Sequence, residues 1–284
     1  MHKQNYKVDF MGLISVSHAN PNGDPLCGGR PRIDSAGYGL ITDVCLKRKL
    51  RNRLLEMNTP IFVSPPDHDT DTLEHRASEI SCTDKHEYAR AACKRWFDVR
   101  GFGQVFSFAG RRSTVSVRGP VTIQHAFSVD PIAIEELPIT RCINSSSPKK
   151  RAPDTLGFRS YVQYGLYIMK GSVCASLAEK TGFSEQDCIR FRNALLDIFT
   201  NDASSARPDG SMTLERLYWW NHHSACGDYS SASVFNTIHI RKKVGIDTPM
   251  RFSDYDITET HLAGLTPRIF ANVIPEQAQE CGSE

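Results

Sequence analysis

The sequence has no closely spaced pair of cysteines. Its nine cysteines are spread over 284 residues, and the nearest two, Cys82 and Cys93, are eleven positions apart. Structural zinc sites are usually built from pairs of cysteines separated by only about two to four residues. The pattern therefore predicts no zinc site of that kind, and we expect neither a metal nor a cofactor.

Long apolar runs are also missing. No stretch approaches the roughly 18 consecutive apolar residues that a membrane-spanning helix needs. The first seven residues, MHKQNYK, lack the apolar core of a secretory signal peptide. We therefore expect a cytoplasmic protein with reduced thiols and no membrane partner.

Neither sign of charge dominates, since 34 Lys and Arg oppose 32 Asp and Glu. The charges are nevertheless segregated along the chain. Residues 1–53 carry nine basic and four acidic side chains, and residues 90–120 carry seven and one, whereas residues 60–87 carry seven acids and two bases. Segregation of this kind favours a basic surface for a polyanion and acidic surfaces for neighbouring proteins, while ordinary solvated faces explain any single cluster equally well.

Apolar periodicity predicts an α+β fold. Thr42 or Asp43 begins one amphipathic helix and Ser184 begins another. Alternating residues predict four strands, at about 6–18, 115–129, 160–170 and 232–241. The order strand, helix, strand, strand, helix, strand is the ferredoxin-like arrangement that RNA-recognition domains share. Because this arrangement supports many functions, it does not identify one.

The buried faces of these elements can be read from the same periods. The first strand places Val8, Phe10, Ile14 and Val16 on one face. The interruption at Gly119 and Pro120 predicts a bend in the second strand. The helices should bury residues spaced three and four apart, namely Leu46, Leu50, Leu54 and Met57 in the first and Cys188, Phe191, Leu195 and Ile198 in the second.

The most informative stretch runs from the first predicted strand into the first helix. It contains residues 18–25 (HANPNGDP), 29–34 (GRPRID) and 40–52 (LITDVCLKRKLRN). Asn-Gly and Asp-Pro dipeptides favour turns, and a glycine-rich loop that ends at a capped helix can present backbone N–H groups to phosphate.

The helix that follows carries two like-charge pairs one turn apart, Lys47 with Arg51 and Lys49 with Arg53. Such pairs mildly destabilise an isolated helix. A phosphate backbone lying on the helix would relieve the repulsion, and a solvated basic face remains the other interpretation.

The glycine-rich stretch resembles the signature of the backbone subunit of type I-C CRISPR Cascade surveillance complexes. Further similar segments are residues 97–106 (FDVRGFGQVF), 117–128 (VRGPVTIQHAFS) and 164–167 (YGLY). The resemblance spans roughly residues 6–245, with the motifs in the same order.

This resemblance implies a non-catalytic subunit that polymerises along a guide RNA. Subunits of that family have a modified RNA-recognition-motif palm, finger-like insertions and a thumb hairpin that folds over the guide. The implied partners are CRISPR guide RNA, copies of the same chain, the large and guide-processing subunits, and target DNA that pairs with the guide in antiviral defence.

The resemblance also assigns the parts of the chain. The palm would comprise residues 1–57, 98–137 and 158–250. The fingers would be 58–97, the thumb 138–157, and an acidic C-terminal segment 251–284.

Guide contacts are expected to position the RNA without reading its sequence. The resemblance and the charge pattern together select twelve candidate RNA-binding residues: Asn20, Asn22, Arg30, Arg32, Lys47, Arg51, Arg111, Arg112, Arg141, Lys149, Lys150 and Arg151.

Two other functions remain open. A metal-dependent ribonuclease would need a carboxylate in the first loop, where Asp24 and Asp34 lie. A single acid is a poor metal site, however, and Asp is common in turns for backbone reasons. A generic RNA-binding regulator, acting as a monomer or dimer, would bind only one or two copies to each RNA.

Three further patterns have plainer interpretations. Residues 100–105 (RGFGQV) partly match an RNA-binding motif of RNA-recognition domains but are predicted to form a packed turn. The acidic run 67–75 is interpreted as a solvated loop. Of His222 and His223, at most one can join any given site, and the Trp pair 219–220 is expected in the core or an interface.

Overall fold

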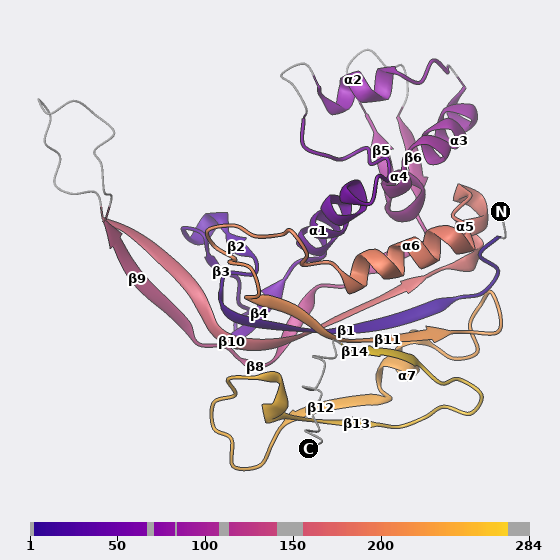
Figure 1. The fold of residues 1–284 in the computed structure, drawn as a ribbon. Helices are drawn as coiled ribbons and strands as arrows, with labels where there is room; N and C mark the ends of the chain where they lie inside the picture. Colours follow the sequence, from indigo (N-terminus) through magenta and orange to yellow (C-terminus); the bar gives the residue numbers. More distant parts are fainter. Residues whose placement is uncertain (1–2, 67–70, 83, 108–113, 141–155, 272–284) are drawn as a thin grey trace, which may run out of the picture.

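An antiparallel sheet forms the centre of a mixed α+β fold (Figure 1). The computed structural model describes residues 3–66, 71–82, 84–107, 114–140 and 156–271. Within these ranges the sheet has eight strands in the order β14-β11-β1-β10-β8-β4, and β7 and β9 also pair with β10. The strands are β1 (Val8–Ala19), β4 (Tyr38–Ile41), β7 (Val121–Ile123), β8 (Ala126–Pro131), β9 (Ile134–Thr140), β10 (Leu156–Val173), β11 (Met212–Asn221) and β14 (Arg268–Ala271).

Strand β1 is buried on both of its faces. Val8 and Phe10 pack in the main core with the helices, whereas Met11 and Leu13 pack in a second core on the opposite face. The sequence predicted one buried face, and that face is confirmed. The second face is buried because the apolar residues of β1 are nearly continuous, a pattern typical of strands covered on both sides.

Three helices cover one face of the sheet: α1 (Asp43–Glu56), α5 (Ala175–Thr181) and α6 (Glu185–Leu196) (Figure 1). Thr42 caps α1 by accepting a hydrogen bond from the backbone N of Cys45. Ser184 caps α6 in a reciprocal capping box with Asp187. Both predicted helix starts are therefore confirmed, and so are the predicted apolar faces, which pack against β1 and β10.

The predicted fourth strand was wrong in position. The strand that pairs with β1 is β11, whereas the predicted segment forms α7 (Ser231–Phe235) and β12 (Ile238–Lys242). Strand β12 pairs with β13 (Tyr255–Glu259) in a separate small sheet that covers the second face of β1. Alternation is a local signal and does not say which strand a segment joins.

The predicted second strand is divided into three. Strand β6 (Val115–Arg118) leaves the central sheet to pair with β5 (Gly103–Phe106), and the chain then bends at Gly119 and Pro120 into β7 and β8. The predicted bend is confirmed. Segment 100–105 was predicted to form a packed turn, but it contains the end of α4 (Phe97–Phe102) and the start of β5. The chain changes direction between them at Gly103, which has a φ of +84° and where a Cβ would strike the backbone of β6.

A separate hydrophobic core lies beside the helical face of the sheet. It contains Phe62, Tyr88, Trp96, Phe106 and other apolar residues between Phe62 and Val115. We call the elements around it the α2–β6 module: α2 (Leu73–Ser78), α3 (Lys85–Arg95), α4 (Phe97–Phe102), β5 and β6. The predicted finger segment 58–97 supplies most of this module.

The remaining elements flank the sheet. Strands β9 and β10 pair from Ile134 with Val162 out to Thr140 with Leu156 and project from the body as a hairpin (Figure 1). This hairpin is the root of the predicted thumb 138–157, whose residues 141–155 lie outside the described ranges. Short elements complete the fold: β2 (Gly23–Asp24), η1 (Pro25–Cys27), β3 (Arg30–Pro31) and η2 (Phe252–Asp254).

The described part of the segment 251–284 is integrated into the fold. It supplies η2, β13 and β14, and β14 extends the central sheet beside β11. None of the helices in the described part of the chain has the length and apolar character that a membrane crossing requires.

Candidate nucleic-acid interface

The glycine-rich stretch forms a folded loop between β1 and α1. Strands β2 and β3 pair across η1, and Gly28 and Gly29 have φ values of +63° and +80°. The loop tip is exposed, with Leu26 the most open side chain in it. The loop therefore presents backbone and charged groups to solvent from a fixed base.

The two predicted asparagines build this base. Asn20 is buried and donates from Nδ2 to the carbonyl oxygen of Gly29 at 2.7 Å. Asn22 accepts at Oδ1 from both the backbone N and the Oγ1 of Thr42, at 3.0 and 2.9 Å. Their amide groups thus fix the loop against its own ends and the start of α1.

The two loop aspartates also hold turns. Asp24 accepts at Oδ1 from the backbone N of Leu26 and lies 3.4 Å from Nη2 of Arg32. Asp34 accepts at Oδ1 from the backbone N of Ala36 and of Tyr38, each at 2.9 Å. Two backbone donors on one carboxylate oxygen account for an Asp at position 34.

The cations of helix α1 are mostly paired with carboxylates. Lys47 lies 2.9 Å from Asp43, and Arg51 donates from Nε to Asp98 of α4 at 2.9 Å. The other like-charge pair is paired as well: Lys49 is buried against Asp202, and Arg53 contacts Glu56 and Asp197. These ion pairs within the protein therefore reduce the repulsion between the like charges of α1, and no bound phosphate is needed to do so.

The pKa values of Lys49 and Asp43 are shifted by burial and by these ion pairs. Burial lowers the pKa of the Lys49 ammonium, although its hydrogen bond to Asp202 opposes the change. Burial alone would raise the pKa of the Asp43 carboxyl, but the hydrogen bond and charge of Lys47 bring it below its usual range. In both cases the charged side chain interacts with a partner inside the protein, Asp202 for Lys49 and Lys47 for Asp43.

Two arginines remain available to a ligand. Arg30, a predicted residue, is half-exposed and lies 2.9 Å from Glu136 of β9, so the loop reaches the base of the hairpin. Arg48 is exposed on α1, and no acidic partner lies beside it in the described ranges. The sequence analysis missed Arg48 because periodicity alone does not separate it from its paired neighbours.

An aromatic pair, the exposed His18 and the half-buried Tyr161, lies at the same end of the sheet. The rings of His18 and Tyr161 have centroids 5.9 Å apart, and the Tyr161 hydroxyl donates to Glu135 at 2.6 Å. His18 has a φ of +50°, an uncommon conformation for a residue with a Cβ. This pair was also missed. His18 begins the quoted loop motif, but its neighbour is supplied by a strand more than a hundred residues away.

Six predicted RNA-binding residues cannot be placed. They lie outside the described ranges, four of them in the predicted thumb: Arg111, Arg112, Arg141, Lys149, Lys150 and Arg151.

The histidine pair and the tryptophan pair have structural roles in the described part of the chain. His222 is fully buried 2.9 Å from Asp9, whereas His223 is exposed, so they belong to different environments as expected. Trp219 and Trp220 lie in the two opposite cores. Among the described residues, no three His, Cys, Asp or Glu side chains come together as a metal site would need. Residues 67–70 of the acidic run lie outside those ranges.

The surface that results combines exposed guanidinium groups with an exposed imidazole ring and a half-buried phenol ring. Arg30, His18 and Tyr161 lie around the loop and the hairpin base, and Arg48 lies on the helix that follows the loop, while neighbouring polar groups are committed to the fold. Guanidinium groups bind phosphate, and rings can stack on bases. The arrangement suits a single nucleic-acid strand.

Comparisons with known proteins show the family to which the chain belongs. The model of the family "CRISPR-associated protein Cas7" matches residues 6–260. The chain therefore belongs to the Cas7 family, which confirms at family level the resemblance found in the sequence. A curated relative from Haloferax volcanii, also described as CRISPR-associated protein Cas7, is 27% identical over 224 residues. That match covers 70% of this chain and 66% of the relative's length.

Two solved structures are also similar. A chain of a "CRISPR RNA-guided surveillance complex, pre-nicking" has a TM-score of 0.49 at 14% identity, covering 75% of this chain and 78% of that one. A chain of a "CRISPR RNA-guided surveillance complex" has a TM-score of 0.46 at 17% identity, covering 75% and 68%.

Proposed function

We propose that this Cas7-family chain is a non-catalytic subunit that coats a CRISPR guide RNA, with copies placed side by side along it. The complex would be a Cascade of type I-C in the cytoplasm, with large and guide-processing subunits, presenting the guide for pairing with target DNA. The observation that carries the proposal is the exposure of Arg30, Arg48 and His18, with the half-buried ring of Tyr161 beside His18, in a chain of this family.

The sheet topology supports an RNA-recognition-type palm. Four of its strands follow the order β11-β1-β10-β8, with α1 between β1 and β8 in the chain and α6 between β10 and β11. This is the strand–helix order of the ferredoxin-like arrangement, with β11 in the place of the last strand. The α2–β6 module and the β9–β10 hairpin then correspond to fingers and thumb.

The chemistry of the surface supports binding without sequence readout. Arg30 and Arg48 are suited to phosphate oxygens, which are the same in every guide. The Asn20 Nδ2 and Asn22 Oδ1 atoms, which could otherwise read base edges, are bonded to Gly29 and Thr42. A subunit that coats any guide needs this tolerance.

The non-catalytic part of the proposal rests on the loop aspartates. Asp34 already accepts two backbone hydrogen bonds on one oxygen, and Asp24 accepts one and faces Arg32. Their positions follow from turn geometry, which makes a catalytic explanation for these residues unnecessary.

The β9–β10 hairpin supports contact between copies. Leu137, Ile139 and Phe158 are 49%, 51% and 69% exposed on its two strands. Leu137 and Ile139 lie on one face of the hairpin, whereas Phe158 pairs with Pro138 and lies on the other face. Exposed apolar side chains on both faces of a projecting hairpin form surfaces that association would bury. A neighbouring copy on the same guide would cover them.

Nuclease protection tests the proposal. Purified chain is mixed with guides of equal length and unrelated sequence, and the protected RNA is measured for wild type, Arg48→Ala and the matched control Arg241→Ala. Arg241 is exposed on β12, on the other face of the sheet. We expect equal protection of all guides, weakened by Arg48→Ala alone. Protection that depends on guide sequence, or equal loss in both variants, would overturn the proposal.

A further inference from the structure

A cavity of about 360 Å³ lies where the small β12–β13 sheet meets the base of the β9–β10 hairpin. Its lining comes from the end of β8, the connection to β9, residues 163–165 of β10, and the ends of β12 and β13 with residues 247–249 between them. None of the residues of the proposed guide surface lines it. A water molecule occupies only about 30 Å³, and small-molecule pockets begin at roughly 300 Å³. The cavity is therefore large enough for a ligand.

Two polar atoms of this lining are buried and have no hydrogen-bond partner in the folded chain. They are the hydroxyl oxygen Oη of Tyr164 and the carboxylate oxygen Oδ2 of Asp130. Tyr164 is only 8% exposed, so its hydroxyl has left solvent without gaining a partner from the protein. A buried polar group without a partner lowers stability. A ligand that bonds to both oxygens would account for two such groups on one cavity.

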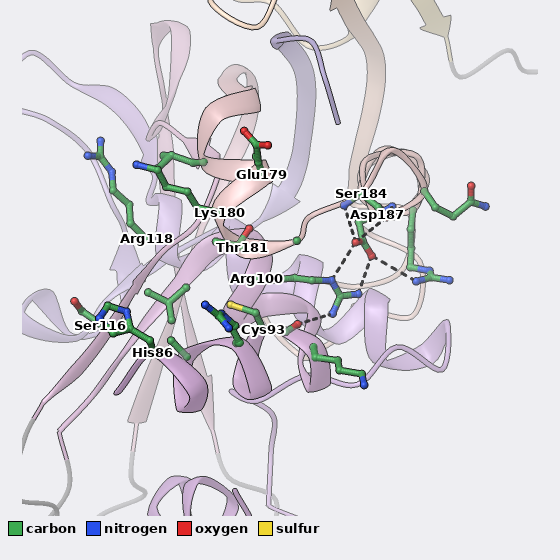
Figure 2. A pocket seen from close by; sticks show the side chains of 18 residues that line it. His86, Cys93, Arg100, Ser116, Arg118, Glu179, Lys180, Thr181, Ser184 and Asp187 are labelled. Atoms are coloured by element: carbon green, nitrogen blue, oxygen red, sulfur yellow. Dashed lines mark hydrogen bonds and ion pairs between the residues drawn. The ribbon is translucent and has the colours of Figure 1, made fainter. Parts of the chain in front are cut away.

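The charges of the lining favour a cationic ligand. Asp130 and Asp247 line the cavity with a single cation, Lys242, which donates from Nζ to the backbone carbonyl oxygen of Asp247 at 2.8 Å. Neither carboxylate forms an ion pair in the part of the chain that the structure describes. The larger cleft between α3 and α5 has the opposite balance, because cations such as Arg118 and Lys180 outnumber its acids (Figure 2).

The two tyrosines of the lining keep neutral hydroxyl groups. Burial raises the pKa of Tyr164, and the charges of Glu215 and Asp254 raise it further. Burial also raises the pKa of Tyr255, and the charge and hydrogen bond of Asp130 add to that change. Neutral hydroxyl oxygens can accept hydrogen bonds. The same carboxylates that raise these pKa values attract a positively charged group.

Hydrogen bonds hold both walls of the cavity in place. On one wall, the backbone N of Gln163 donates to the carbonyl oxygen of Ala133 at 3.0 Å. On the other, Asp254 accepts at Oδ2 from the backbone N of Met250 at 2.8 Å, and its carbonyl oxygen accepts from the backbone N of Lys243 at 2.9 Å. The loop between β12 and η2 is thereby fixed, so little rearrangement is needed for a ligand to bind.

We propose that this cavity binds a guanidinium group, carried by an arginine side chain of another protein or by a free small molecule. A guanidinium has five N–H donors and no acceptor, which complements a lining with unpaired acceptor oxygens. It is more weakly hydrated than an ammonium, so it enters a half-closed cavity at a lower cost. Pro131, Ile132 and Pro249 supply apolar surface for the methylene groups attached to it.

The test is calorimetric titration of the full chain with three probes. They are agmatine, an acetylated and amidated Gly-Arg-Gly peptide, and the same peptide with the uncharged analogue citrulline in place of arginine. The cavity variants are Asp130→Asn, which removes a charge, and Tyr164→Phe, which removes the unpaired hydroxyl. Their matched controls lie outside the lining: Asp256→Asn, exposed on β13, and Tyr167→Phe, which removes another buried hydroxyl that has no partner. Melting temperature is measured for every variant.

We expect wild type to bind both guanidinium probes saturably, and the citrulline peptide about tenfold more weakly, because citrulline makes no charge-assisted hydrogen bond. Asp130→Asn should lower the affinity about tenfold and Tyr164→Phe about fivefold, whereas both controls should bind as wild type does. Tyr164→Phe and Tyr167→Phe should both melt at or above the wild-type temperature, since each loses a hydroxyl that has no partner. Tighter binding of the arginine peptide identifies a protein partner, and tighter binding of agmatine identifies a free ligand.

The proposal fails if wild type binds neither guanidinium probe saturably, or binds the citrulline peptide as tightly as the arginine peptide. Equal loss of affinity in Asp130→Asn and Asp256→Asn would also overturn it, because net charge alone would then explain the binding. So would a Tyr164→Phe chain that melts well below wild type, since its hydroxyl would already have a partner. If Asp130→Asn does not fold, the comparison of Tyr164→Phe with Tyr167→Phe still decides the question.

Discussion

Arg100 of α4 donates two hydrogen bonds to Asp187 of α6, from Nη2 at 2.7 Å and from Nε at 3.1 Å. Asp187 also accepts from the backbone N and the Oγ of Ser184 and so completes the cap of α6. Burial alone would raise the pKa of the Asp187 carboxyl, but the hydrogen bonds and charge of Arg100 outweigh it and lower the pKa below 3.8.

Replacing Asp187 with Asn should destabilise the fold by about 3 kcal/mol, because Arg100 would lose its buried partner. Because the pKa is lowered in the folded chain, the ion pair stabilises wild type fully at neutral pH and progressively less as the pH falls through the range in which an aspartate carboxyl takes up a proton. Urea unfolding at pH 7 and at acid pH measures both effects. Asp187→Asn should lose stability at pH 7 and show a weaker acid dependence. Unchanged stability at pH 7 would contradict this account.

Arg48 and Arg51, three positions apart on α1, should respond in opposite ways to charge reversal. Arg51→Glu places a carboxylate beside the buried Asp98 and should cost about 3–5 kcal/mol of stability. Arg48→Glu should leave the melting temperature unchanged and weaken guide binding equally for unrelated sequences. Thermal melts and filter binding separate the two. A stable Arg51→Glu chain that fails to bind RNA would restore Arg51 to the interface.

Tyr161 should contribute through its ring. Stacking of a base on an aromatic side chain is worth about 1–3 kcal/mol, so Tyr161→Ala should weaken guide affinity about tenfold. Tyr161→Phe loses only the hydrogen bond to Glu135 and should bind nearly as wild type does. Equal affinities for the Ala and Phe variants would show that the ring does not stack.

Asp34 should be dispensable for chemistry. Asn retains the oxygen that accepts from Ala36 and Tyr38, so Asp34→Asn should fold and bind guide as wild type does. Guide-complementary RNA incubated with wild type and Mg²⁺ or Mn²⁺ should stay intact. Regularly spaced cleavage by wild type that Asp34→Asn abolishes would establish the ribonuclease instead.

Local signals in the sequence were sufficient for the two helices it predicted, α1 and α6, but not for the other helices or the complete sheet. Thr42 and Ser184 cap their helices through hydrogen bonds within three residues, so the sequence shows them directly. Choosing β11 over β12 as the partner of β1 depends on packing in two cores. Alternation within a short segment carries no information about that choice.

The candidate site was also predictable only in part. The sequence showed which residues are charged, but it did not show which of them are already paired with carboxylates inside the protein. Arg51 and Lys49 are paired with Asp98 and Asp202, which are 47 and 153 residues away along the chain. Only the folded chain shows that Arg48, between them, has no such partner in the part of the chain that the structure describes.

Native mass spectrometry of the chain assembled on guides of increasing length tests the central claim most directly. Because copies placed side by side each occupy a fixed segment, the number of protein copies per RNA should rise in regular steps with guide length. It should do so whatever the guide sequence. One or two copies per RNA at every length would contradict the account and identify the chain as an RNA-binding protein that does not coat its guide.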